Sequence, residues 1–120
     1  MTETQNSKQY DLEERTFEFA KRTREFVKKL PKTTGNFEDG KQLIRSSGSV
    51  GANYIEANES LSKKDFIMRV KISRKEAKET RYWLQLVDIR EPELELERGK
   101  LVQEIGELMK IFGAILEKSK

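Results

Sequence analysis

The chain has 120 residues and a mass of 14.0 kDa, enough for one domain with a modest hydrophobic core but not for two. It contains neither cysteine nor histidine, which excludes disulfides, thiolate metal sites and the commonest general base. The net charge is only +3, no window approaches the ~20 apolar residues of a membrane span, and the polar N-terminus lacks the apolar segment of a signal peptide. These features predict a soluble, cytoplasmic protein without membrane contact.

The first elements expected along the chain are a polar tail and a helix. Residues 1–10 are polar, and we expect them to be disordered. From residue 11 to residue 30, apolar side chains recur at three- and four-residue spacing, as on the buried face of a helix. Asp11 is a suitable N-cap for this helix, and Pro31 ends it.

The second predicted helix, residues 37–59, contains the small-residue stretch RSSGSVGANYIEA, which begins at Arg45. Two glycines in a helix interior cost roughly 2 kcal/mol relative to alanine, so we expect another backbone to approach closely. Two loop interpretations are less favoured. A phosphate-binding loop would need a preceding strand and the lysine of a Walker motif, and a GSVG turn that clamps nucleic acid would need surrounding strands.

This helix has no charged residue between Ser46 and Ile55. A helix without charges around its circumference is expected to be covered on more than one side, whereas one bundle buries only one stripe of it. We therefore predict that its outer face contacts another subunit. The residues assigned to oligomer contact or close helix packing are Arg45, Ser47, Gly48, Ser49, Gly51, Ala52, Asn53 and Glu56.

The third predicted helix, residues 63–89, has the clearest signals. Ser62 and Asp65 have the spacing of a capping box, and Leu61 and Phe66 are placed to form a hydrophobic staple around it. A heptad seam of apolar and small residues then continues along the whole segment. The sequence therefore predicts a long helix with one buried face.

The fourth predicted helix, residues 93–118, repeats the pattern with bulkier side chains. Pro92 suits its first turn. No segment of the chain shows the alternation of apolar and polar residues that is typical of strands. Residues 11–120 are therefore predicted to form an all-α domain, an antiparallel up-and-down four-helix bundle.

Four segments, in this order, carry a resemblance to a known family: DLEERTFEFAKR, KKLPKT, QLIRSSGSVGANYIEA and SKKDFIMRVKISRKEAKETRYWL. From about Asp11 to Met109 the chain resembles the proteins encoded in intervening sequences of bacterial 23S ribosomal RNA genes. A related set comprises the accessory variability determinant proteins of diversity-generating retroelements. The resemblance implies a small bundle that assembles as a ring-like homopentamer, with nucleic acid and, in the retroelement set, a reverse transcriptase as partners. It leaves the biochemical role of the ribosomal-insert group unassigned.

Basic residues concentrate in two segments, residues 15–32 and 63–81, each with a net charge of +5, whereas residues 88–107 carry −4. Such an uneven distribution attracts charged partners. On the third helix four lysines share the face opposite the apolar seam, and basic residues of the first helix recur every seven positions. The predicted phosphate-binding residues are Arg15, Arg22, Lys29, Lys63, Lys64, Lys71, Arg74, Lys75, Lys78 and Arg81. A solvated surface without a partner is the equally weighted alternative; phosphate contacts would position a nucleic acid without reading its sequence.

Acidic residues on two helices raise the question of a metal site. A di-iron site in a bundle needs a Glu-x-x-His pattern and the chain has no histidine, so we expect no metal and no cofactor. Instead we expect Glu76 to pair with neighbouring lysines, and Asn53, Glu56 and Glu79 to hydrogen-bond to hydroxyl groups and fix helix register. Arg45 is expected to be an isolated surface arginine or, in an oligomer, to face a neighbour's carboxylate.

Tyr82, Trp83 and Leu84 form the one strong aromatic cluster. Packing in the core or at an interface is the favoured interpretation, and stacking on bases is the alternative. No nucleophile has an evident partnered base, so no enzymatic activity is expected. The leading hypothesis is a non-enzymatic homo-oligomer, pentameric by resemblance, that binds RNA, DNA or a nucleic-acid-processing partner such as a reverse transcriptase through its basic helix faces. The alternative is a structural scaffold for a protein partner, without affinity for nucleic acid.

Overall fold

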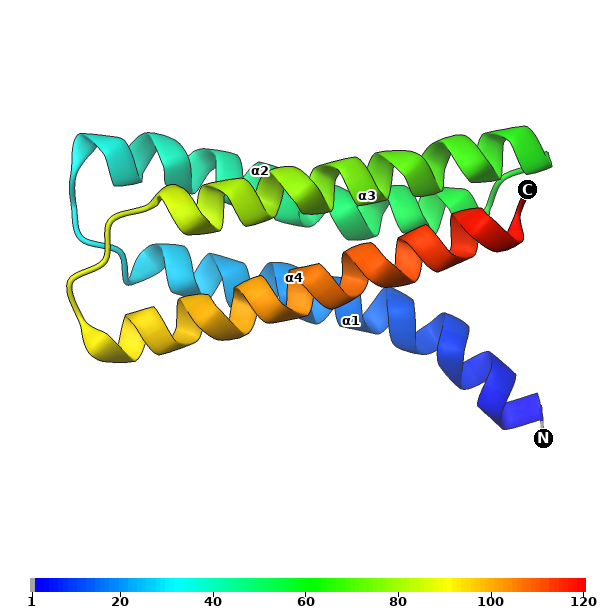
Figure 1. Cartoon of the computed structure of the whole chain (residues 1–120), viewed down its shortest axis with the longest axis horizontal. Coiled ribbons are helices and arrows are strands. Elements are labelled where there is room, and N and C mark those ends of the chain that lie inside the picture. Colours follow the sequence, from blue (N-terminus) through cyan, green and yellow to red (C-terminus); the bar gives the residue numbers. More distant parts are fainter. Residues whose placement is uncertain (1) are drawn as a thin grey trace.

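The computed structural model describes the backbone of residues 2–120 and the side chains of residues 12–120. Its four helices are α1 (Thr2–Lys28), α2 (Thr34–Asn58), α3 (Lys63–Leu86) and α4 (Pro92–Lys118). They run alternately up and down, with α2 and α3 together along the top of the view in Figure 1 and α1 and α4 along the bottom. The fold is thus the predicted all-α four-helix bundle. None of these helices has a stretch that is both long and apolar enough to cross a membrane, in the part of the chain that is described.

Local sequence signals set the starts of three helices. Thr33 Oγ1 accepts a hydrogen bond from the backbone N–H of Asn36 at 3.0 Å, so α2 begins slightly before the predicted residue 37. Ser62 Oγ accepts from the N–H of Asp65 at 3.1 Å, which confirms the predicted cap of α3. Pro92 occupies the first turn of α4, where its missing N–H breaks no hydrogen bond.

Two predictions about helix starts differ from the structure. The helical backbone of α1 begins at Thr2, so Asp11 lies inside the helix and is not its N-cap. The predicted disorder of residues 1–10 stays a prediction, because Met1 and the side chains of residues 1–11 lie outside the described part of the chain. Leu61 is 99% exposed and contacts nothing apolar, so the predicted staple with Phe66 is absent.

The hydrophobic core lies where the apolar stripes of the four helices meet. Its fully buried side chains include Phe19 and Phe26 of α1, Leu43 of α2, Leu84 of α3 and Phe112 of α4. Burying one such side chain stabilises the fold by about 1.5–3 kcal/mol. The core therefore draws on all four predicted stripes, and it fixes which face of each helix remains outside.

The small residues of α2 let two neighbouring helices approach it closely. A β-carbon at Gly51 would lie 2.8 Å from Oγ1 and 3.1 Å from Cβ of Thr16, so an alanine there would push against α1. On the side of α3, the fully buried Ser46 has its Oγ 2.8 Å from the hydroxyl of Thr80. The predicted close approach is confirmed, and the helices that approach belong to the same chain.

Asn36 joins the two loops at one end of the bundle. It is buried, and its Nδ2 donates to the carbonyl oxygens of Pro31 and Asp88, each at 3.0 Å. Its Oδ1 accepts from the backbone N–H of Asp88 at 2.9 Å. Because one amide side chain links the α1–α2 loop to the α3–α4 loop, it fixes the position of one helical hairpin relative to the other.

Candidate nucleic-acid interface

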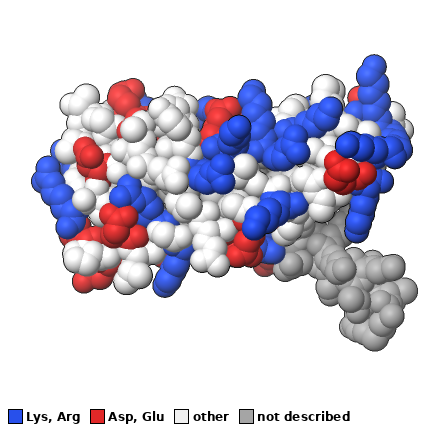
Figure 2. Space-filling view, in the orientation of Figure 1, with Lys and Arg blue, Asp and Glu red and all other residues white. Residues whose placement is uncertain are grey.

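The outer face of α3 carries four exposed lysines, which we call the α3 lysine strip: Lys64, Lys71, Lys75 and Lys78. At 3.6 residues per turn, positions separated by four or seven residues lie on one face of a helix. Within residues 12–120, none of the four lysines forms an ion pair. Figure 2 shows Lys and Arg gathered over the upper right of this face, where the first half of α3 lies. The strip is thus a row of ammonium groups open to solvent.

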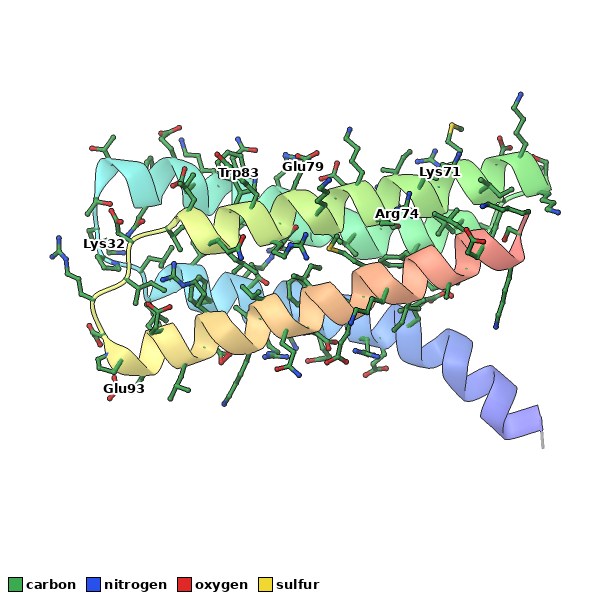
Figure 3. The ribbon with its side chains drawn as sticks, viewed as in Figure 1. Lys32, Lys71, Arg74, Glu79, Trp83 and Glu93 are labelled. Atoms are coloured by element: carbon green, nitrogen blue, oxygen red, sulfur yellow. The ribbon has the colours of Figure 1, made fainter. Side chains whose placement is uncertain are left out.

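Lys63, Arg74 and Arg81 flank the strip, and the two arginines reach toward α4. Arg74 and Arg81 line an open groove of about 560 Å³ between α3 and α4, with Glu107 among the residues of its wall. Gly113 leaves space for the guanidinium of Arg74, whose Nη1 would be 3.9 Å from a β-carbon at that position. Figure 3 shows Arg74 on the α4 side of α3. The basic surface therefore extends from the strip into this groove.

Arg15 and Arg22 of α1 do not join this surface, because both face α4. Arg15 makes a bidentate contact to Glu104, with Nη2 to Oε1 at 2.7 Å and Nε to Oε2 at 3.0 Å, and it lies 3.3 Å from Glu107. Hydrogen bonding to Glu104 raises the pKa of Arg15 above its usual value. Arg22 lies 3.8 Å from Glu97. Both arginines are paired with carboxylates of α4, and we leave them out of the candidate interface.

Lys29 also lies apart from the strip. It borders an open groove of about 760 Å³ between α1 and the start of α4, together with carboxylates such as Glu91 and Glu93. Figure 3 places Glu93 at the end of the bundle opposite Lys71. The mixed charges of this groove do not favour an anion.

Among the described residues, no group of three His, Cys, Asp or Glu side chains is arranged to hold a metal ion.

Arg45 of α2 is not isolated. Its Nη2 lies 3.3 Å from Oε1 of Glu76 and 3.4 Å from Oε1 of Glu79, both on α3 of the same chain. These contacts take the place of the predicted pairing of Glu76 with lysines and of Glu79 with hydroxyl groups. Arg45 therefore ties α2 to α3 within one chain.

The residues assigned to oligomer contact divide into two groups. Ser47 and Gly51 are buried within the chain. Asn53 accepts a hydrogen bond from Arg69 of α3 at 3.0 Å and donates to Ser49 Oγ at 3.0 Å; because Ser49 is on the same helix, the contact that joins two helices is the one with Arg69 and not the predicted one with a hydroxyl. The members of the set that remain at least partly exposed, and that have no side-chain hydrogen bond to another helix within residues 12–120, are Gly48, Ser49, Ala52 and Glu56.

An exposed apolar surface on α1 and α2 was not found from the sequence. Its main side chains are Phe17, Phe37 and Ile55. A groove of about 530 Å³ adjoins Phe37, between the end of α1 and the start of α2, and Ile44 lies in its wall. Helical register could have revealed these residues, because Phe17 stands two positions before the buried Phe19 and so points to the other side of α1.

The aromatic cluster at the end of α3 is divided between core and surface. Leu84 is fully buried, and Trp83 is half-buried and packs against the core, as predicted. Tyr82, in contrast, is 59% exposed. Its ring meets the ring of Trp83 edge-on, with centroids 5.0 Å apart and an interplanar angle of 80°. The indole N–H of Trp83 is buried and has no acceptor within the described residues.

The fold defines a class: a small antiparallel four-helix bundle. The sequence pattern of the 23S rRNA-intervening sequence protein family matches residues 8–114, and the chain belongs to that family. A crystal structure of a protein of unknown function from the S23 ribosomal protein family of Bacteroides thetaiotaomicron is similar to it. The two chains are 30% identical over 88% of this chain and 97% of the other, with a TM-score of 0.73. No curated protein matches the chain.

Proposed function

We propose that this protein is a non-enzymatic homo-oligomer that binds nucleic acid through the α3 lysine strip and the flanking Arg74 and Arg81. One observation carries the proposal: the lysines of the strip are exposed and have no carboxylate partner among residues 12–120, whereas Arg15, Arg22 and Arg45 are paired with carboxylates. Ammonium groups in such a row bind phosphates and release counterions, with little dependence on base sequence.

Assembly of several copies would multiply this charge. Support for assembly comes from the outer side of α2, where Gly48 and Ala52 leave an uncharged surface, and from the exposed apolar side chains Phe17, Phe37 and Ile55. Phe37 and Ile55 stand 18 residues apart on the same face of α2, and an apolar helix face of this kind is a common feature of subunit contacts. The number five, and a reverse transcriptase as a further partner, rest on the resemblance to the retroelement proteins alone.

Fluorescence anisotropy with mixed-sequence RNA and DNA oligonucleotides tests the binding. Affinity should fall about tenfold or more between 50 and 200 mM salt, because several phosphate contacts are lost together. Charge reversal by Lys71→Glu, Lys75→Glu and Lys78→Glu together should abolish binding. The matched control reverses Lys28, Lys32 and Lys41, which are exposed at the α1–α2 end of the molecule, and it should retain most of the affinity. Equal losses in both triple variants would mean that total charge, and not the strip, determines binding.

A structural scaffold for a protein partner is the second candidate, and the exposed apolar surface on α1 and α2 favours it. Sedimentation equilibrium distinguishes the two. A wild-type protein that is oligomeric but binds no oligonucleotide at low salt would be a scaffold. Ile55→Glu should shift the oligomer toward the 14.0 kDa monomer. Lys71→Glu should leave the mass of the oligomer unchanged. A wild-type protein that is monomeric at all concentrations would contradict the assembly proposed above.

A further inference from the structure

The α3 lysine strip ends at an exposed aromatic ring. Tyr82 follows Lys78 by four residues and Lys75 by seven, so helical geometry places it on the same face as the strip. At 1.5 Å per residue, Lys71, Lys75, Lys78 and Tyr82 follow one another at intervals of about 4–6 Å along the helix axis. In Figure 3, Lys71 and Trp83, the neighbour of Tyr82, mark the two ends of this part of α3. An aromatic ring in line with a row of cations is the combination that single-strand-binding surfaces use.

The ring of Tyr82 is held in place while much of its surface stays open. Its edge-on contact with Trp83 fixes its position, because Trp83 is itself packed against the core. No hydrogen bond within residues 12–120 engages the Tyr82 hydroxyl, and more than half of the residue is exposed to solvent. A large apolar ring in this state loses little conformational entropy when a flat ligand covers it.

We infer that Tyr82 stacks on a base of a single-stranded nucleic acid whose phosphates lie along Lys71, Lys75 and Lys78. This inference rests on the proposed function and adds the class of ligand. In a duplex, each base is covered by its stacked neighbours, and a side chain reaches a base face only after unstacking it. In a single strand the base faces are accessible, so a ring next to a row of phosphate contacts favours single-stranded RNA or DNA.

Variants of Tyr82 test the contribution of the aromatic ring to binding separately from that of the neighbouring lysines. Stacking on one base contributes about 1–3 kcal/mol, so Tyr82→Ala should weaken single-strand binding by roughly tenfold. Tyr82→Phe keeps the ring and should bind like the wild type, whereas Tyr82→Leu should resemble Tyr82→Ala. Duplex binding should change less than about twofold in all three, and the salt dependence should stay the same because no charge is removed. Leu86→Ala, which removes an exposed apolar side chain one turn away, is the matched control and should have no effect.

An oligonucleotide with abasic sites provides a second measurement on the same proteins. It keeps the phosphates and removes the bases, so the wild type should bind it less tightly than the normal strand, whereas Tyr82→Ala should bind both equally. Trp83 is the only tryptophan of the chain and lies against Tyr82, so its fluorescence should change with the normal strand and not with the abasic one.

The outcomes keep the two proposals apart. A wild type that binds no nucleic acid at low salt overturns the proposed function and this inference with it. Salt-dependent binding that the Lys71, Lys75 and Lys78 reversals abolish, but that Tyr82→Ala leaves unchanged, overturns the inference alone. A change of oligomer mass in Tyr82→Ala, with single-strand affinity intact, would assign the ring to a protein contact and would also overturn it.

Discussion

Two segments of this chain have the same net charge of +5, but two arginines of the first segment are paired with another helix, whereas the lysine row of the second segment is not, in the part of the chain that is described. In residues 15–32, Arg15 and Arg22 turn toward α4 and pair with its carboxylates. In residues 63–81, the lysines of the α3 strip point to solvent and have no ion-pair partner among residues 12–120. Net charge along a sequence therefore does not identify a binding surface; the charge on the neighbouring helix decides whether a basic residue is free.

The strongest test of this comparison reverses one charge in each segment. Arg15→Glu should destabilise the bundle by about 2–3 kcal/mol, because it places a third carboxylate beside Glu104 and Glu107 and leaves both without their partner. We expect a loss near the lower of these two values, because the side chains of Arg15 and Glu104 are 29% and 19% exposed and water screens part of the interaction. Lys75→Glu, the same charge change on the α3 strip, should alter the free energy of unfolding by less than about 0.5 kcal/mol.

Urea denaturation measures both variants. An unchanged m-value would show that the unfolded state is comparable and that the difference in midpoint reports stability. The comparison fails if Lys75→Glu destabilises the protein as much as Arg15→Glu does, since the lysine would then have an intramolecular partner of equal importance.

Gly48 and Gly51, two of the glycines of α2, extend the comparison from charge to packing. Gly51→Ala should destabilise the protein by about 1–2 kcal/mol, because the new methyl group meets Thr16 at 2.8–3.1 Å and α1 must shift. Gly48→Ala should stabilise an isolated chain by up to about 1 kcal/mol, since no atom outside its own turn lies within 4 Å and alanine is the better helix former.

The Gly48→Ala variant also reports on assembly. Thermal unfolding measured over a range of protein concentrations separates the stability of the chain from that of the oligomer. A variant that unfolds at higher temperature but dissociates more readily would place Gly48 in a subunit contact. A destabilised Gly48→Ala chain at monomeric concentration would contradict the open space around this glycine.

Sequence patterns predicted the helices better than they predicted the contacts between them. Apolar periodicity predicts the buried side of a helix because it depends on that helix alone, and buried residues such as Phe19, Leu43 and Leu84 lie on those sides. The partners of Arg15 and Arg45 could not be predicted this way, because an ion pair depends on the relative height and rotation of two helices. The role of Asn36 was missed for the same reason: its hydrogen bonds reach Asp88, which is 52 positions away in sequence.

A single neutralised lysine gives a smaller effect than these stability changes and tests the strip directly. Lys75→Gln should weaken binding to a single strand severalfold and reduce the slope of log affinity against log salt by about 0.7, as expected for one lost phosphate contact. Arg22→Gln, which removes the same charge from a side chain that faces Glu97, should leave the slope unchanged. Anisotropy titrations at four or more salt concentrations measure both slopes. Equal slopes for the two variants would place the phosphates outside the strip.

The smallest expected effect concerns Tyr54, a buried ionisable group between α1 and α2. Burial raises the pKa of its hydroxyl, the charge of Glu13 raises it further, and a hydrogen bond with Asn58 opposes both. Because the folded-state pKa exceeds the unfolded value of about 10, the neutral tyrosine stabilises the fold below that pH, and this contribution is lost as the pH rises through the folded-state pKa.

Tyr54→Phe should therefore lose less stability than the wild type between about pH 9 and pH 11, by roughly 1 kcal/mol or less. Lysines that titrate in the same range are common to both proteins, so their contribution cancels when the two free energies of unfolding are subtracted at each pH. A difference that is constant across this range would mean that the hydroxyl is hydrated in the folded state, and it would contradict the enclosure of Tyr54 by its own chain.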